Sequence, residues 1–517
     1  MSDASHISDI DYEVGQDNIQ FLGLDIHNPV FLISSIVIFG FVLIVLMFQE
    51  GAASFFGELR PWLTSTFDWL FMGAANLFVL FCLFLIVTPL GKIRLGGADA
   101  KPDYSYAGWF AMLFAAGMGI GLMFFGVLEP VYHFQNPPLG LDAEDTEAAR
   151  ALGMAATIYH WGLHPWAIYA VVALALAFFS FNRGLPLTIR SAFYPILGDR
   201  VWGWFGHIID TLAVFATMFG LATSLGFGAE QATAGLNYLF GVPATDVTKV
   251  VLILGITAVA LISVLAGLDA GVKRLSEINM TLALLLLVFI LAVGPTLEIL
   301  AGVVQGGFTY LVNVVPLSNW VGREDTDFMH GWTTFYWAWW ISWSPFVGMF
   351  IARVSRGRTV REFIIGVLIV PTLACVLWMN AFGGTAVSQF LNLGYTGVTE
   401  TIQAWTPELS LFKMLELLPL SNVLSFIGIV LVIVFFVTSS DSGSLVIDTI
   451  TAGGKLDAPV SQRVFWCTLE GLVAIALLLG GGLASLQAAS IATGFPFAIV
   501  LVAMVYSIYR GLKAESG

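Results

Sequence analysis

The third apolar segment of the chain, residues 107–126, contains the stretch Gly117-Met118-Gly119-Ile120-Gly121. Each glycine inside a helix costs roughly 1 kcal/mol relative to alanine, so three glycines in five positions predict an interruption of the helix. A second breaker, Ser344-Pro345, occurs five apolar segments later. For an isolated pair of glycines one turn apart, close packing of two membrane helices would be the simpler explanation. Interruptions that recur at matching positions of two halves are instead typical of inverted-repeat membrane carriers.

The composition predicts the class of the protein. Hydrophobic residues make up 58% of the chain and charged residues only 11%. Repeated apolar runs of about 20 residues are long enough to cross a bilayer as helices, so we expect an all-α, polytopic membrane protein. Hydropathy predicts twelve spans, near residues 29–49, 67–88, 107–126, 154–181, 205–231, 247–268, 277–300, 331–351, 362–386, 423–447, 463–484 and 486–509.

The two breakers divide these spans into two sets of five. Residues 107–303 (spans 3–7) and 331–510 (spans 8–12) are predicted to form a LeuT-like 5+5 inverted repeat. Outside the repeats we expect an N-terminal segment, spans 1 and 2, an interfacial helix with an external loop, and a short tail, at residues 1–28, 29–106, 304–330 and 511–517.

The basic residues indicate the orientation. Of the 21 Lys and Arg residues, 16 fall in the even-numbered connections and the C-terminal tail. The positive-inside rule therefore predicts that both termini are cytoplasmic, in a multi-pass protein of the cell (inner) membrane. Nothing in the sequence suggests nucleic-acid binding.

The eighth span is unusually rich in tryptophan, with Trp337, Trp339, Trp340 and Trp343 inside seven residues. Tryptophan gathers at membrane interfaces, so an aromatic belt is one explanation. A desolvated box of aromatic faces is the other, and it would attract an onium cation by roughly 2 kcal/mol for each well-placed ring. We favour the box, which makes a small cationic or zwitterionic solute the first hypothesis.

The fourth span adds Trp161, Trp166 and Tyr169 around Pro165. Trp161 would face away from the other two rings on a straight helix. Because Pro165 cannot donate a hydrogen bond to the preceding turn, it is expected to bend the helix and let all three rings line one cavity. The neighbouring histidines are given no role.

In the tenth span, Thr438 and Ser439 stand beside Asp441. Such hydroxyls often only bond back to the preceding helical turn. Sodium needs oxygen ligands, however, and hydroxyls together with carbonyls of an unwound helix would supply them. Asp210 and Thr217 in the fifth span form a weaker candidate of the same kind.

Together these stretches resemble the betaine/choline/carnitine transporter family over roughly residues 20 to 510, through Gly117 to Pro130, Trp161 to Tyr169, Tyr336 to Arg358 and Phe435 to Gly443. The resemblance implies a box for the trimethylammonium group, formed by Trp161, Trp166, Tyr169 and Trp340. It implies a permeation path along Trp339, Trp343 and Phe350. It also implies an unwound stretch that faces the substrate, formed by Met118, Gly119 and Gly121. It also implies a first sodium site at Ala115, Met118, Phe435, Thr438 and Ser439, and a second at Thr217 and Phe346.

Two departures from the family pattern bear on function. The second sodium site should have a hydroxyl four residues after Thr217, where this chain has Leu221, so that site is in doubt. Choline carriers of the family have an acid at the position of Gly121, which favours here a zwitterion such as glycine betaine or a sulfonium analogue such as dimethylsulfoniopropionate. The resemblance thus implies sodium symport, and a homotrimer with the stretch near Phe308 to Trp320 at its interface.

Other classes fit less well. A membrane enzyme would need a convergent acid, base or metal cluster, and the seven histidines show no ligand spacing. A channel would need a continuous polar pore, which an occluding aromatic box contradicts. The alternative that stays open is a sodium-independent or proton-coupled carrier or exchanger of choline-type or carnitine-type solutes.

Overall fold

The computed structural model describes residues 12–266 and 273–516. Apart from one hairpin, these residues form helices and their connections. The strands are β1 (Asn18–Phe21) and β2 (Leu24–His27). The helices are α1 (Val30–Met47), α2 (Gln49–Thr66), α3 (Asp68–Val87), α4 (Tyr106–Gly117), α5 (Ile120–Gln135), α6 (Thr146–Trp161), α7 (Leu163–Phe181), α8 (Tyr194–Leu197), α9 (Trp204–Phe240), α10 (Asp246–Ala266), α11 (Lys273–Val293), α12 (Thr296–Ser318), α13 (Thr334–Val354), α14 (Val360–Leu393), α15 (Gly397–Gln403), α16 (Ser410–Leu415), α17 (Ser421–Thr451), α18 (Val460–Leu479) and α19 (Leu483–Ser516). Tight helical turns, among them the π-helical η6 (Asp327–Thr333), complete the list.

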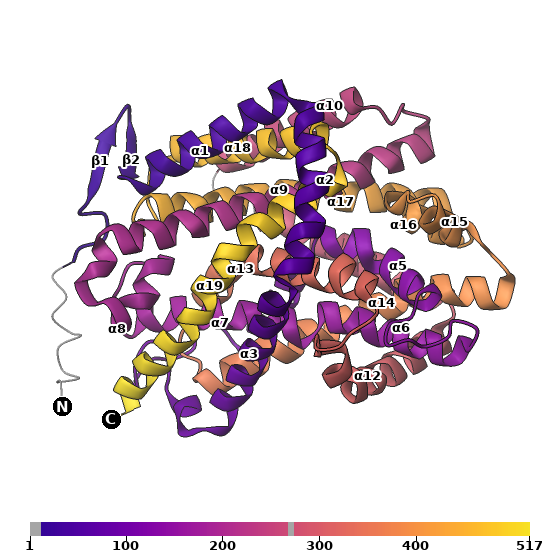
Figure 1. Cartoon of the computed structure of the whole chain (residues 1–517), viewed down its shortest axis with the longest axis horizontal. Coiled ribbons are helices and arrows are strands. Elements are labelled where there is room, and N and C mark those ends of the chain that lie inside the picture. Colours follow the sequence, from indigo (N-terminus) through magenta and orange to yellow (C-terminus); the bar gives the residue numbers. More distant parts are fainter. Residues whose placement is uncertain (1–11, 267–272, 517) are drawn as a thin grey trace.

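Eleven of the described helical segments are long and apolar enough to cross a membrane, and the bent pair α4–α5 raises the number to twelve. The predicted all-α polytopic class is therefore confirmed. Hydropathy alone includes α12 and omits α13. Yet α13 is buried along almost its whole length and packs between α7, α9 and α19 (Figure 1), whereas α12 buries only Ile299, Gly306, Tyr310 and Leu317. The indole and hydroxyl groups of α13 lower its hydropathy without placing it at the surface.

The interruption predicted from the glycine run is present. α4 ends at Gly117, Met118 and Gly119 are extended, and α5 leaves at 65° to α4. Extended residues inside a span leave the carbonyls of the preceding turn without intrahelical partners. The backbone oxygens at the end of α4 therefore become available to a ligand or an ion.

The second interruption was predicted in the wrong place. α13 continues through Pro345, because the Oγ of Ser344 donates to the Ile341 carbonyl at 2.7 Å, which is the oxygen that the missing N–H of Pro345 would have bonded. The fourth span has a one-residue irregularity at Gly162 (φ −101°, ψ −128°) between α6 and α7, without the sharp bend seen between α4 and α5. Pro165 then falls in the first turn of α7, where an N–H has no intrahelical partner to lose.

Three features of the periphery differ from the expectation. The seventh span ends at Val293, earlier than predicted, because Pro295 separates it from α12. The amphipathic helix α2 between the first two spans was missed, and so was the β1–β2 hairpin. The hairpin is anchored to the end of α17, where Asp25 pairs with Lys455 at 2.5 Å and Asn18 donates to the Ala452 carbonyl at 2.9 Å.

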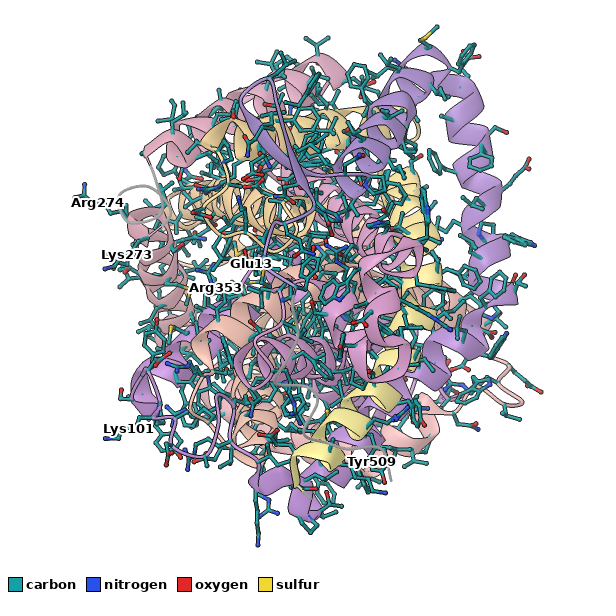
Figure 2. All side chains as sticks on the ribbon, turned by 90° about the vertical axis from the view of Figure 1, so that its left-hand side faces the viewer. Glu13, Lys101, Lys273, Arg274, Arg353 and Tyr509 are labelled. Carbon is teal, nitrogen blue, oxygen red and sulfur yellow. The ribbon has the colours of Figure 1, made fainter. Side chains whose placement is uncertain are left out.

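The ends of the described chain lie on one side of the molecule. In Figure 1 the hairpin and the C-terminal end of α19 are at the left, and α15 and α16 are at the right. Figure 2 looks onto that left side and labels Lys101, Lys273, Arg274 and Arg353 there. The side that carries both ends therefore also carries several of the basic residues used to predict the orientation.

Candidate functional site

A cavity of about 50 Å³ lies where the α4–α5 break faces α7 and α13. Ligand pockets for drug-sized molecules are usually roughly 300–1,000 Å³, so this cavity suits a small solute. The structure brings nine of the ten predicted substrate residues to its wall, namely Met118, Gly119, Gly121, Trp161, Trp166, Tyr169, Trp339, Trp340 and Trp343. Phe350 does not line the cavity and its side chain is 38% exposed.

The aromatic rings meet mostly edge to face. The centroid of Trp340 lies 4.9 Å from that of Trp161 and 6.2 Å from that of Tyr169, with interplanar angles of 73° and 74°. Trp166 and Tyr169 are 5.3 Å apart at 71°. Rings that meet at right angles can turn their electron-rich faces toward a common centre, and this is the arrangement that binds an onium group.

Hydrogen bonds to backbone carbonyls fix the three indole rings of α13 that line the cavity. Trp340 Nε1 donates to the His160 carbonyl at 3.0 Å. Trp343 Nε1 donates to the Gly220 carbonyl of α9 at 2.7 Å, and Trp339 approaches the same oxygen at 3.4 Å. With their N–H groups bonded, the ring faces alone remain for a ligand.

The glycines of the break allow the rings to approach the backbone. A Cβ on Gly121 would lie 2.7 Å from Cη2 of Trp161, and one on Gly117 would lie 3.3 Å from Cζ2 of Trp166. The first distance is shorter than any normal carbon contact, so any other residue at 121 displaces the indole ring of Trp161. Gly117 and Gly121 therefore leave room for the two indole rings at the cavity wall, in addition to interrupting the helix.

The sequence analysis missed a buried polar cluster beside the box. Glu129, His133 and His160 are fully buried, and one ligand atom from each lies within 4.8 Å of the others. The prediction that the histidines lack ligand spacing was therefore wrong for His133 and His160. Two signals were available in the sequence: Glu129 is an acid three residues after the predicted third span, and His133 follows it by four residues, one helical turn later.

Zinc could use this set of one carboxylate and two imidazoles. Two of the three side chains, however, already make hydrogen bonds: Glu129 accepts on both oxygens, and His160 contacts the Thr333 hydroxyl at 2.8 Å, whereas His133 only approaches Glu129 at 3.5 Å. An ion would have to break these bonds, so the cluster is a hydrogen-bonded group of side chains centred on Glu129.

The residues predicted for the first sodium site lie on α17 and at the end of α4. Thr438 and Ser439 are half-buried, and α17 packs against α5. Thr438 donates to the Val434 and Phe435 carbonyls at 3.0 and 3.2 Å, so its oxygen lone pairs still point outward. The Ala115 carbonyl accepts one bond, from Met118 N at 3.2 Å. This donor set of hydroxyls and carbonyls fits a hard cation.

The second predicted sodium site is less complete. Thr217 is fully buried and donates to the Ala213 carbonyl at 2.7 Å, and Phe346 is partly buried on α13. Leu221 is fully buried and packs so tightly on Gly443 of α17 that a Cβ there would lie 2.3 Å from its Cδ1. An isobutyl group therefore fills the position where the family places a hydroxyl.

Both acids suggested as part of cation sites are paired with arginine instead. Asp441 accepts from Arg463 Nη2 at 2.7 Å, and both side chains are buried. Asp210 lies 3.1 Å from Arg190 Nε and accepts from the Arg190 backbone N–H at 2.9 Å. Both acids are buried within the helices of the predicted spans, and in each case the partner comes from another part of the chain.

Comparison with known proteins gives a consistent result. The chain matches the family model described as BCCT, betaine/carnitine/choline family transporter, over residues 29–517. It is 62% identical to a glycine betaine/proline/choline transporter of Vibrio parahaemolyticus, covering 98% of this chain and 94% of that one. Glycine betaine transporter 1 of the same species is 55% identical, with 99% of each chain covered. The glycine betaine transporter OpuD of Bacillus subtilis is 45% identical, with 88% of each covered. The chain is therefore a multi-pass membrane transporter of the betaine/carnitine/choline family.

Proposed function

We propose that this transporter carries a zwitterionic quaternary ammonium or sulfonium solute of the glycine betaine type by sodium-coupled symport. The observation that supports this most is the box of Trp161, Trp166, Tyr169 and Trp340 around a small cavity whose described lining contains no charged side chain. Aromatic faces attract the onium end of such a solute. Because a zwitterion brings its own carboxylate, the wall needs no acid to balance its charge.

The relatives support the same choice. All three transporters compared above are named for glycine betaine. The name of the 62% identical relative also includes choline and proline. Choline is therefore a second candidate substrate. Against it, this chain has Gly121 at the position where the resemblance to the family's choline carriers would imply an acid.

Uptake by proteoliposomes tests the proposal directly. Labelled glycine betaine, dimethylsulfoniopropionate, carnitine and choline should be offered with and without an inward sodium gradient. We expect accumulation of glycine betaine or the sulfonium analogue only with the gradient, since Thr438, Ser439 and the carbonyls of the broken span form a suitable donor set. Equal uptake without sodium would support the exchanger instead.

Replacing Gly121 with aspartate should shift the preference toward choline. The new carboxylate would face the cavity, repel the carboxylate of a zwitterion and attract a substrate that is only cationic. Competition for uptake measures the change as the ratio of choline to glycine betaine inhibition. Since a Cβ at 121 meets Trp161 at 2.7 Å, Gly121→Asn is the matched control for the displaced ring. The charge argument fails if both variants give the same ratio.

We also propose that the protein is a homotrimer in the cell (inner) membrane with both termini cytoplasmic. The support for the trimer is α12, whose Leu297, Val304, Phe308 and Val315 are all more than two-thirds exposed and repeat at helical spacing. The double substitution Val304→Asp with Phe308→Asp should convert the purified protein from a trimer to a monomer. Light scattering after size-exclusion chromatography measures the mass, and an unchanged mass would exclude this face as the interface.

A further inference from the structure

Glu129 links the aromatic box to the polar cluster behind it. It lies in α5, ten residues after the α4–α5 break, and its side chain is completely buried. Its oxygen Oε2 accepts the indole N–H of Trp161 at 2.7 Å and the hydroxyl of Tyr336 at 2.5 Å. Its other oxygen, Oε1, contacts His160 Nδ1 at 2.6 Å and lies 3.5 Å from His133 Nε2. One carboxylate therefore holds groups from α5, α6 and α13.

The two rings held by Oε2 both contact Trp340. Trp161 meets Trp340 at right angles, 4.9 Å between centroids, and Tyr336 stacks on it at 5.7 Å and 21°. Trp339 also lies against Trp340, at 4.7 Å and 15°, and its centroid is 6.2 Å from that of Tyr336. The position of Trp340 in the box is therefore set by neighbours that are themselves fixed by Glu129.

An anionic acceptor also changes the electron distribution of the rings that donate to it. Hydrogen bonds to a carboxylate are shorter and stronger than those to a neutral oxygen, and bonded groups in a low-dielectric interior polarise one another. An indole N–H or phenol O–H that donates to a carboxylate leaves its own ring richer in electrons. The attraction between such a ring and a cation increases accordingly.

We propose that Glu129 is a positioning residue that sets the preference of the site for an onium group, acting through Trp161 and Tyr336. The proposal rests on the proposed function, because it assumes that the box holds the substrate. It assigns Glu129 no contact with the substrate itself. The carboxylate fixes the two rings and makes Trp161, which lines the cavity, a better partner for a positive charge.

The test compares two ligands that differ only in the charge of their head group. Glycine betaine carries a trimethylammonium group, and 3,3-dimethylbutanoate carries a neutral tert-butyl group of nearly the same shape. Binding is measured on the purified full-length protein by titration calorimetry. In Glu129→Gln we expect glycine betaine to bind about tenfold more weakly, while binding of the neutral analogue changes less than about twofold.

Matched variants separate this effect from loss of structure. Glu129→Asp keeps the charge and should restore most of the preference for glycine betaine over the neutral analogue. Glu470 is another fully buried acid, located in α18 outside the cavity, so Glu470→Gln should leave the preference unchanged. Should Glu129→Gln fail to fold, the preference is read from Glu129→Asp, where its loss would overturn the proposal.

Two results would overturn the inference. Equal weakening of both ligands in Glu129→Gln would mean that the carboxylate only holds the rings, and an unchanged ratio with unchanged affinities would mean that it does neither. Failure of the proposed function is visible separately: if Trp340→Leu binds glycine betaine normally, the box is not the site, whatever Glu129 does.

Discussion

Replacement of Trp340 by leucine is expected to weaken glycine betaine binding about thirtyfold while the protein stays folded. Leucine keeps the wall apolar but removes a ring whose contribution to onium binding is about 2 kcal/mol, which corresponds to roughly thirtyfold in Kd. Trp340 is the ring that contacts both Trp161 and Tyr169, so its loss opens the box on the α13 side. Titration of purified, monodisperse variant protein with glycine betaine gives the affinity.

The control for this substitution is another buried tryptophan. Trp466 in α18 is completely buried, donates to the hydroxyl of Thr451 at 3.1 Å and does not line the cavity. Trp466→Leu removes a core ring of the same size, and we expect it to lower stability without changing the Kd. Unchanged glycine betaine binding in Trp340→Leu would refute the box assignment.

Removal of both hydroxyls of the predicted first sodium site, by Thr438→Ala with Ser439→Ala, should abolish sodium-driven accumulation. At about 100 mV each sodium ion contributes roughly 2.3 kcal/mol from the membrane potential. A tenfold gradient adds about 1.4 kcal/mol, so one ion supports an accumulation of about five-hundredfold. An ion left with too few oxygen ligands will not leave water for an apolar helix bundle. Uptake against a gradient in proteoliposomes should fall to simple equilibration.

A hydroxyl elsewhere on the same helix serves as the control. Thr449 in α17 donates to the Leu445 carbonyl at 2.8 Å, the same kind of bond that Thr438 makes, but it was not predicted as a ligand. Thr449→Ala should keep sodium dependence. Full accumulation in the double variant, or sodium-independent uptake by the unchanged protein, would favour the exchanger. Leu221 occupies the position of a ligand in the second predicted site. Whether one or two sodium ions accompany each substrate is therefore to be measured from the sodium dependence of uptake.

The elements that hydropathy could predict are those whose environment is lipid. Spans such as α1 and α3 are apolar on every face, so composition alone predicts them. α2 carries Glu50, Glu58 and Arg60 and fails any such test, although it forms a full helix. The β1–β2 hairpin turns at Leu22 and Gly23 with positive φ at both residues, and leucine is an unusual residue at such a turn. Local sequence therefore gave weak signals for both.

Residues of the site were predictable where the chemistry lies in adjacent positions of the chain. The aromatic residues of α7 and α13 stand out in the sequence, and the break between α4 and α5 follows from its glycines. Glu129 could only be understood with its partners known, because Trp161 and Tyr336 come from two other helices. The same holds for Asp441, which looked like a cation ligand until Arg463 of the next helix was seen to neutralise it.

The repair of the backbone at Pro345 by Ser344 makes the two counterpart spans of the predicted repeats mechanically unequal. One wall of the cavity is a hinge, since the chain between α4 and α5 is extended and its 65° bend can change by rotation about a few bonds. The opposite wall is α13, which is one continuous helix without an extended segment at which it could bend. A carrier built this way need not rock its halves as mirror images of each other. Access to the two sides of the membrane would then change by movement of α4 and α5 against the continuous helix α13, which carries the stacked pair Trp339 and Trp340.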